Sequence, residues 1–220
     1  MSGMVHRVKR LAILGSTGSI GRQTLEVVRA FPQRFRVVAL SGGKNLSLLK
    51  KQVGEFKPKL VSTESGAIGE RIGKADYLTM EEIAAHPDVE LVVVATAGKA
   101  GLGPTLSAIR AKKSVALANK EVLVMAGEVV AAEARRHGVE IMPIDSEHSA
   151  IWQCLRGEQK KDIARLILTA SGGPFRLKSQ QQLAAVTPEE ALRHPTWQMG
   201  TKVTIDSATL MNKGMEVIEA

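Results

Sequence analysis

The fold class is decided by the stretch Leu11-Ala12-Ile13-Leu14-Gly15-Ser16-Thr17-Gly18-Ser19-Ile20-Gly21. Its first four residues are apolar and typical of a short buried strand, whereas residues 20–30 have the pattern of a helix. The glycines between them permit a tight turn and a close approach of the backbone. A strand, a glycine-rich turn and a helix in this order indicate a dinucleotide-binding domain, in which the helix N-terminus offers free N–H groups to a pyrophosphate.

Strands and helices are expected to alternate from this stretch as far as Ile144. The strands are built from Val, Ile, Leu and Ala, which suits a parallel sheet that is buried on both faces. Alternation of this kind predicts an α/β fold with a doubly wound parallel sheet. The expected strands are 11–14, 35–40, 60–61, 89–95, 114–117 and 139–144, and the expected helices are 20–30, 46–53, 80–85, 104–111 and 121–137.

The sequence changes character after Ile144, which predicts two domains. We expect a dinucleotide-binding domain over residues 1–144 and a second, α+β domain over residues 145–220. In the second domain, residues 149–155 have the pattern of a helix and residues 163–169 that of a strand. The segment 171–203 is rich in Pro, Gly, Gln and His, which is typical of an irregular lid or binding loop.

Composition and charge narrow the functional classes. The chain has 220 residues, 44% of them hydrophobic, so it can bury a sizeable core. The net charge is +8, but aromatic residues are not interleaved with the basic ones, which argues against nucleic acid and fits anionic small molecules. The single cysteine, Cys154, excludes a disulfide within the chain. Without a secretory signal or a run long enough to cross a bilayer, the expected location is cytoplasmic, with no membrane segment.

The segment that follows the second expected strand favours NADP over NAD. An NAD site usually has an acidic residue there for the ribose hydroxyls, but this chain has Ser41-Gly-Gly-Lys-Asn45. Lys44 is placed to meet the additional phosphate of NADP. An ordinary loop lysine is an equal alternative for Lys44 taken alone.

A pair of carboxylates, Asp145 and Glu147, follows the last expected strand of the first domain. If the chain is still extended there, both side chains point to the same side, and together they need a cation or a shared proton. Oxygen ligands favour Mg²⁺ or Mn²⁺ over zinc. An acid pair at a helix N-terminus is the commoner meaning of this pattern. His148 could be a ligand, a substrate contact or a polar residue at the start of a helix.

A second group of polar residues lies near the end of the chain. If residues from about Ala208 are helical, Asn212, Lys213 and Glu216 share one face beside Ser207. An amide, an ammonium and a carboxylate together suggest a phosphate site next to a metal, to which Glu216 contributes a third carboxylate. A solvated amphipathic helix end is the alternative reading of this segment alone.

Two further features fit a phosphorylated substrate. Ser171 and the two glycines after it could present N–H and O–H groups to a phosphate, although a plain turn explains them as well. His194 and Trp197 lie in the irregular segment. Trp197 could cover a substrate, but a tryptophan in a polar loop is more often a partial core anchor.

Five motifs in this order resemble the 1-deoxy-D-xylulose 5-phosphate reductoisomerase family. They are Gly15-Ser-Thr-Gly-Ser-Ile-Gly21, Ala118-Asn-Lys-Glu121, Asp145-Ser-Glu-His148, Ser171-Gly-Gly-Pro-Phe-Arg176 and residues 206–216. The resemblance implies NADPH, a divalent metal (Mg²⁺, Mn²⁺ or Co²⁺) and a phosphorylated sugar as substrate. It implies isomerisation and reduction of deoxyxylulose phosphate to methylerythritol phosphate, in isoprenoid biosynthesis, by a homodimeric enzyme.

The resemblance also assigns residues to roles. The implied metal ligands are Asp145, Glu147 and Glu216. The implied catalytic residues are these three together with Lys120 and His148. The implied cofactor contacts are Thr17, Gly18, Ser19, Ile20, Gly43, Lys44, Asn45, Asn119 and Glu121. The implied substrate contacts are Lys120, Ser146, Glu147, Ser171, His194, Trp197, Ser207, Asn212, Lys213 and Glu216.

The resemblance leads us to expect a shortened chain, because enzymes of the family continue beyond the helix that carries Glu216. It thus implies an NADP-binding domain over residues 1–144 followed by an incomplete α+β catalytic domain over residues 145–220. The strand expected at 163–169 would then lack sheet partners. An NADPH-binding protein without turnover is therefore the main alternative to an active reductoisomerase. Another dehydrogenase on the same fold is a weaker alternative, because it leaves the Ser171 loop and the Asn212, Lys213 and Glu216 face unexplained.

Overall fold

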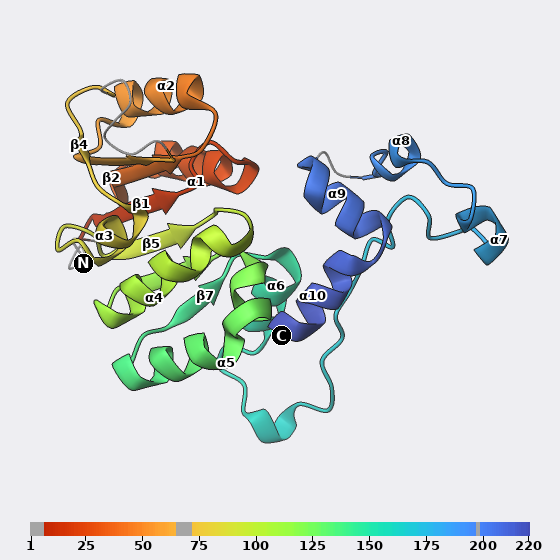
Figure 1. The fold of residues 1–220 in the computed structure, drawn as a ribbon. Coiled ribbons are helices and arrows are strands. Elements are labelled where there is room, and N and C mark those ends of the chain that lie inside the picture. Colours follow the sequence, from red (N-terminus) through yellow and green to blue (C-terminus); the bar gives the residue numbers. More distant parts are fainter. Residues whose placement is uncertain (1–6, 65–71, 197–198) are drawn as a thin grey trace. The chain divides into compact units, whose positions relative to one another are not determined.

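The structure is a computed structural model that describes residues 7–64, 72–196 and 199–220 (Figure 1). The chain divides into two compact units, Met1–Asp145 and Ser146–Ala220. The division falls one residue after the predicted boundary. Among the described residues, no helix combines the length and the apolar character that crossing a membrane requires.

The first unit is built on a seven-stranded parallel sheet with the order β4-β3-β2-β1-β5-β6-β7. The sequence predicted this sheet except for the two-residue β4, which is too short to give a pattern. The strands are β1 (Lys9–Leu14), β2 (Phe35–Gly42), β3 (Leu60–Thr63), β4 (Asp76–Tyr77), β5 (Leu91–Val94), β6 (Ser114–Leu117) and β7 (Ile141–Pro143).

Helices cover both faces of this sheet, which confirms the doubly wound fold (Figure 1). Side chains alternate along β1, so that Leu11 and Ile13 pack with α1 and α2, whereas Ala12 and Leu14 pack with α3, α4 and α5. The helices are α1 (Ser19–Ala30), α2 (Leu46–Phe56), α3 (Met80–Ala85), α4 (Leu102–Arg110) and α5 (Lys120–His137). The sequence predicted each of them, with bounds that differ by a few residues at most.

The loop between β1 and α1 depends on two glycines. Gly15 has φ +87°, and a Cβ on it would lie 2.5 Å from the carbonyl oxygen of Ala95 at the end of β5. A Cβ on Gly21 would lie 2.3 Å from the carbonyl oxygen of Gly15. These approaches involve backbone atoms, which cannot turn aside as a flexible side chain can. The loop can be this compact because both positions are glycine, which has no Cβ to collide with the neighbouring backbone.

Changing Gly21 to Ala is expected to lower the free energy of unfolding by about 1–3 kcal/mol, the usual cost of overpacking a well-packed site. Urea denaturation of the two proteins measures the difference. Gly54→Ala is the matched control, because Gly54 is exposed within α2 and a Cβ there meets nothing within 4 Å. The control should be neutral or slightly stabilising. Equal stability of Gly21→Ala and wild type would contradict the close approach.

The described residues of the second unit form helices and irregular segments without a strand, so the strand predicted over 163–169 is wrong. Leu166 and Ile167 are 54% and 71% exposed, and no other segment of this unit's described part is a strand to pair with them. A short run rich in apolar residues forms a strand only where a neighbour accepts and donates the ladder hydrogen bonds. The unit contains α6 (Ser146–Cys154), α7 (Gln180–Leu183), α8 (Pro188–Ala191), α9 (Thr201–Ala208) and α10 (Met211–Glu219).

Two further predictions for the second unit are corrected by the structure. The segment 171–203 is only partly irregular, because capping boxes at Ser179 and Thr187 start the short helices α7 and α8. The last helix begins at Met211 rather than near Ala208. Leu210 has φ +60°, a left-handed conformation that separates α9 from α10.

Candidate functional site

The candidate nucleotide site lies in the first unit, where β1 and β5 are neighbours and the strand order changes direction. In open α/β sheets, ligands bind at such a switch point beyond the carboxyl ends of the strands. Gly18 is the N-cap of α1, and the first turn holds the uncharged residues Ser19, Ile20 and Gly21. The N–H groups of this turn have no partner inside the helix, so they are available to an anion.

The segment that directly follows β2 contains an exposed lysine, Lys44, and the N-cap residue of α2, Asn45. The Oδ1 of Asn45 accepts the N–H of Leu48 at 3.1 Å. Glu64 directly follows β3 and was not predicted from the sequence, because an acid near the cofactor is expected after the second strand. Its carboxylate lies beside Gly43, where a Cβ would come within 2.9 Å of Glu64 Oε1.

Asn119 links the ends of β5 and β6 beneath this site. Its side chain is buried and donates from Nδ2 to the carbonyl oxygen of Gly98 at 2.9 Å and to Thr96 Oγ1 at 3.3 Å. Among the described residues, its buried Oδ1 has no hydrogen-bond partner. A buried acceptor left in this state is unfavourable, so the position suits a ligand that donates a hydrogen bond.

Lys120 and Glu121 form the first turn of α5. Lys120 Nζ lies 2.6 Å from Asp145 Oδ2, and both side chains are mostly buried. Asp145 is the last residue of the first unit and directly precedes the helix that carries Glu147. The sequence named Lys120 and Asp145 without predicting that they form an ion pair.

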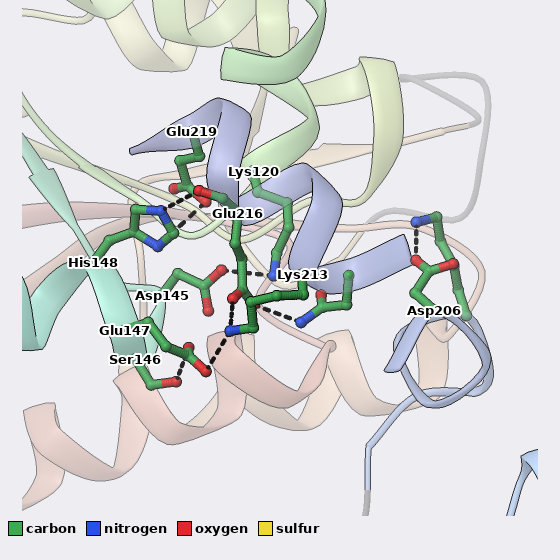
Figure 2. A network of polar contacts seen from close by, with 11 residues as sticks. Lys120, Asp145, Ser146, Glu147, His148, Asp206, Lys213, Glu216 and Glu219 are labelled. Atoms are coloured by element: carbon green, nitrogen blue, oxygen red, sulfur yellow. Dashed lines mark hydrogen bonds and ion pairs between the residues drawn. The ribbon is translucent and has the colours of Figure 1, made fainter. Parts of the chain in front are cut away.

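A buried cluster of charges joins α6 to α10 in the second unit. Figure 2 shows the Lys213 ammonium between the carboxylates of Glu147 and Glu216. Its Nζ lies 3.1 Å from Glu147 Oε1 and contacts Glu216 Oε2, while Asn212 Nδ2 donates to Glu216 Oε1. The Glu216 side chain is 1% exposed. The predicted shared face of Asn212, Lys213 and Glu216 is therefore present.

The pKa values of Glu147 and Lys213 favour the charged forms of these two side chains. Burial acts to raise the pKa of Glu147, but hydrogen bonds from Ser146 and Lys213 hold it below the ordinary value. Burial acts to lower the pKa of Lys213, but the carboxylates of Glu216 and Glu147 hold it above the ordinary value. Two carboxylates that share one cation are the arrangement that a divalent metal also satisfies.

The prediction that the chain is still extended from Asp145 to Glu147 is wrong. Ser146 begins α6, so Glu147 lies in the first turn of a helix, and Ser146 Oγ donates to Glu147 Oε2 at 2.6 Å. An acidic side chain is favoured there because the helix dipole is positive at its N-terminus. The commoner reading of the pattern, an acid at a helix start, therefore holds for Glu147.

His148 is buried and contacts α10 (Figure 2). Its Nε2 lies 2.8 Å from the backbone carbonyl oxygen of Glu216, which can only accept, so Nε2 carries the proton. Its Nδ1 lies 3.6 Å from Glu219 Oε2. The imidazole thus holds the backbone of Glu216 against α6.

Ser171 and His194 meet in a second polar group of the same unit. His194 Nδ1 accepts the N–H of Thr196 at 3.2 Å, so in the neutral ring Nε2 carries the proton and donates to Ser171 Oγ at 3.1 Å. The N–H of Gly173 also donates to Ser171 Oγ. With two donors on its oxygen, the Ser171 hydroxyl directs its own hydrogen elsewhere, as a phosphate contact requires.

Ser207 lies close to this group, because a Cβ on Gly173 would come within 2.6 Å of the Ser207 carbonyl oxygen. The structure therefore brings together Ser171, His194 and the backbone of Ser207, which are far apart in the sequence. Trp197 lies outside the described residues.

The sequence did not identify Gln52 as a functional candidate. It lies on α2 between Leu49 and Val53 and is 4% exposed, as part of an otherwise apolar buried face. A polar residue at a buried helical position is the signal that could have singled it out. Its partner is Ser16 in the loop that precedes α1.

Comparisons of the sequence with family models and with known proteins point to the same family. Residues 11–127 match the family described as 1-deoxy-D-xylulose 5-phosphate reductoisomerase, and residues 141–220 match the C-terminal domain of that name. A protein of this name from Bacillus cereus (strain Q1) is 53% identical over 224 residues, which cover 97% of this chain and 58% of that protein. The chain thus spans little more than half the length of this relative.

Solved structures agree with the sequence comparison. A DOX-P reductoisomerase in complex with NADPH, fosmidomycin and magnesium has a TM-score of 0.86 and 43% identity, over 97% of this chain and 57% of that one. The 1-deoxy-D-xylulose 5-phosphate reductoisomerase of Zymomonas mobilis in complex with NADPH has a TM-score of 0.88 and 38% identity, over the same shares.

Proposed function

Because the chain belongs to the 1-deoxy-D-xylulose 5-phosphate reductoisomerase family, we propose that it carries the cofactor, metal and substrate sites of that reaction. The reaction converts 1-deoxy-D-xylulose 5-phosphate to 2-C-methyl-D-erythritol 4-phosphate with NADPH and a divalent metal, in the non-mevalonate route to isoprenoids. The observation that carries the proposal is the contact of Lys213 with Glu147 and Glu216, since it places two carboxylates around one cation.

The residues present fit a magnesium or manganese ion. One oxygen of Glu147 and one of Glu216 lie within 4.8 Å of each other, and hard divalent cations prefer oxygen ligands. Asp145 immediately precedes this helix in the chain, and we propose it as the third ligand. When bound, the ion would supply Lewis-acid stabilisation of the charge that develops on substrate oxygens. His148 would keep Glu216 in place by holding its backbone.

The nucleotide loop fits NADPH. The N-terminus of α1 would receive the pyrophosphate, and exposed Lys44 would meet the 2′-phosphate. Asn119 Oδ1, which has no hydrogen-bond partner in the described part of the chain, would accept a hydrogen bond from the bound cofactor. The nicotinamide would supply the hydride, while the protein supplies orientation and charge.

The substrate phosphate is assigned to two groups of donors in the second unit. The first contains Ser171, whose hydroxyl hydrogen is directed away from His194, together with Ser207. The second contains Asn212 and Lys213. Lys213 would leave its carboxylates when a metal neutralises them and would then be available to the phosphate. We propose Lys120 and Ser146 as further substrate contacts.

The proposal includes assembly as a homodimer in the cytoplasm, as the family resemblance implies, with neither nucleic acid nor membrane as a partner. Analytical ultracentrifugation of the purified protein measures the assembly. A monomer at micromolar concentration would contradict the dimer.

The proposal is tested by mixing the purified protein with 1-deoxy-D-xylulose 5-phosphate, NADPH and Mg²⁺ and following the absorbance of the reduced nicotinamide. We expect a loss of absorbance that requires both the substrate and the metal. If NADPH binds but is not consumed under any of these conditions, the chain is a cofactor-binding protein without turnover. If NADPH does not bind, the proposed cofactor site is wrong.

A further inference from the structure

Gln52 is buried and makes two hydrogen bonds to Ser16, a residue of the nucleotide loop that lies 36 positions earlier in the sequence. Its Nε2 donates to the carbonyl oxygen of Ser16 at 2.9 Å, and its Oε1 accepts the hydroxyl of Ser16 at 2.7 Å. Both residues are buried, with Ser16 0% and Gln52 4% exposed. The orientation of the amide is fixed, because a backbone carbonyl can only accept a hydrogen bond.

The rest of the loop is held from the other side by Ser41. Its carbonyl oxygen accepts the N–H groups of Gly15 at 3.2 Å and Ser16 at 2.8 Å, and its Oγ lies 3.0 Å from the nitrogen of Gly15. The N–H of Gly18 is also used, because it donates to the carbonyl oxygen of Gly15. The first N–H of the loop that these contacts leave available is therefore that of Thr17.

The direction of this N–H follows from the planarity of the peptide group. The bond between Ser16 and Thr17 is trans, so the Ser16 carbonyl and the Thr17 N–H point in opposite directions from one rigid plane. Gln52 holds the carbonyl inward, toward α2. The Thr17 N–H must therefore point outward, on the side where the N-terminus of α1 is available to an anion.

We infer that Gln52 is a positioning residue that aims the Thr17 N–H at the pyrophosphate of the bound dinucleotide. The inference rests on the proposed NADPH site and adds to it a residue that does not touch the cofactor. Without Gln52, the Ser16–Thr17 peptide can rotate, and a rotated carbonyl would present its oxygen to the phosphates. The effect should be confined to ligands that contain the pyrophosphate.

The test compares two ligands in wild type and in Gln52→Met, which preserves the length of the side chain and removes both hydrogen bonds. NADPH affinity, measured by nicotinamide fluorescence, is expected to fall about 10- to 100-fold, the value of one hydrogen bond to a charged group. The affinity for adenosine 2′-monophosphate, which lacks the pyrophosphate, should change by less than about twofold. Calorimetric titration measures that ligand.

Two further variants keep the test decisive. Gln153→Met is the matched control, because it removes an exposed Gln–Ser hydrogen bond in the second unit and should change neither affinity. Gln52→Asn keeps an amide that is one methylene too short for both bonds, so it should reduce NADPH affinity by a smaller factor even if Gln52→Met does not fold.

Three outcomes would overturn the inference. They are unchanged NADPH affinity in both Gln52 variants, equal losses for the two ligands, and a fall in thermal stability with unchanged NADPH affinity. Failure of the wild-type protein to bind NADPH is a different result, since it would remove the proposed function on which the inference rests.

Discussion

Changing Glu147 to Gln is expected to weaken Mn²⁺ binding by more than about 100-fold and to abolish metal-dependent turnover. Glutamine keeps the size of the side chain but removes one of the two negative charges that surround Lys213 in the second unit. NADPH affinity should stay within about twofold of wild type, because the groups assigned to the cofactor belong to the first unit. Electron paramagnetic resonance of Mn²⁺ and nicotinamide fluorescence measure the two affinities.

Glu190→Gln is the matched control for this experiment. Glu190 also pairs with a lysine of the second unit, at 2.9 Å from Lys178 Nζ, but it is only one carboxylate and lies on the short helix α8. Its replacement should leave Mn²⁺ affinity unchanged. A collapse of NADPH binding in Glu147→Gln would show that the two sites are not separate.

The second large effect is expected for Lys213→Met in the absence of metal. The variant leaves Glu147 and Glu216 without their shared cation, and the Glu216 side chain is 1% exposed. We expect the free energy of unfolding to fall by about 1–3 kcal/mol. This is less than for a fully buried pair, because Lys213 itself is 19% exposed. Urea denaturation with and without Mg²⁺ measures it.

Magnesium should stabilise Lys213→Met more than it stabilises wild type, because the ion no longer competes with an ammonium for the two carboxylates. Turnover should nevertheless fall by more than about 100-fold, since the proposed phosphate contact is absent. Lys178→Met, which removes another Lys–Glu pair of the unit, should show neither effect. Equal stabilisation by Mg²⁺ in Lys213→Met and wild type would contradict competition at Glu147 and Glu216.

The first unit could be predicted closely because its pattern is local. Each strand is a short apolar run, each helix has its own apolar face, and the structure reproduces α3 (Met80–Ala85) and β6 (Ser114–Leu117) at the predicted bounds. The segment 163–169 has the same kind of pattern without a neighbouring strand. This segment shows that a short apolar run becomes a strand only when a neighbouring strand is available to pair with it.

In the second unit, residue spacing alone could predict which side chains lie together only within a single helix. The face shared by Asn212, Lys213 and Glu216 follows from their spacing in α10. The contact of Lys213 with Glu147 spans 66 residues, and no local rule gives it. The role of Gln52 was missed for the same reason, because its hydrogen bonds to Ser16 join residues that are 36 positions apart in the sequence.

The strand order has a consequence for how the chain is made. On the ribosome, β1 is synthesised before its two neighbours, and β2 follows soon enough to cover one edge. The other edge of β1 pairs with β5, where Leu11 lies opposite Leu91. The backbone groups on that edge therefore have no strand partner until β5 has been translated. An open edge of apolar strand is a template for pairing with other chains. Among the strands of this sheet, β1 therefore has the longest stretch of chain between its own synthesis and that of its last partner.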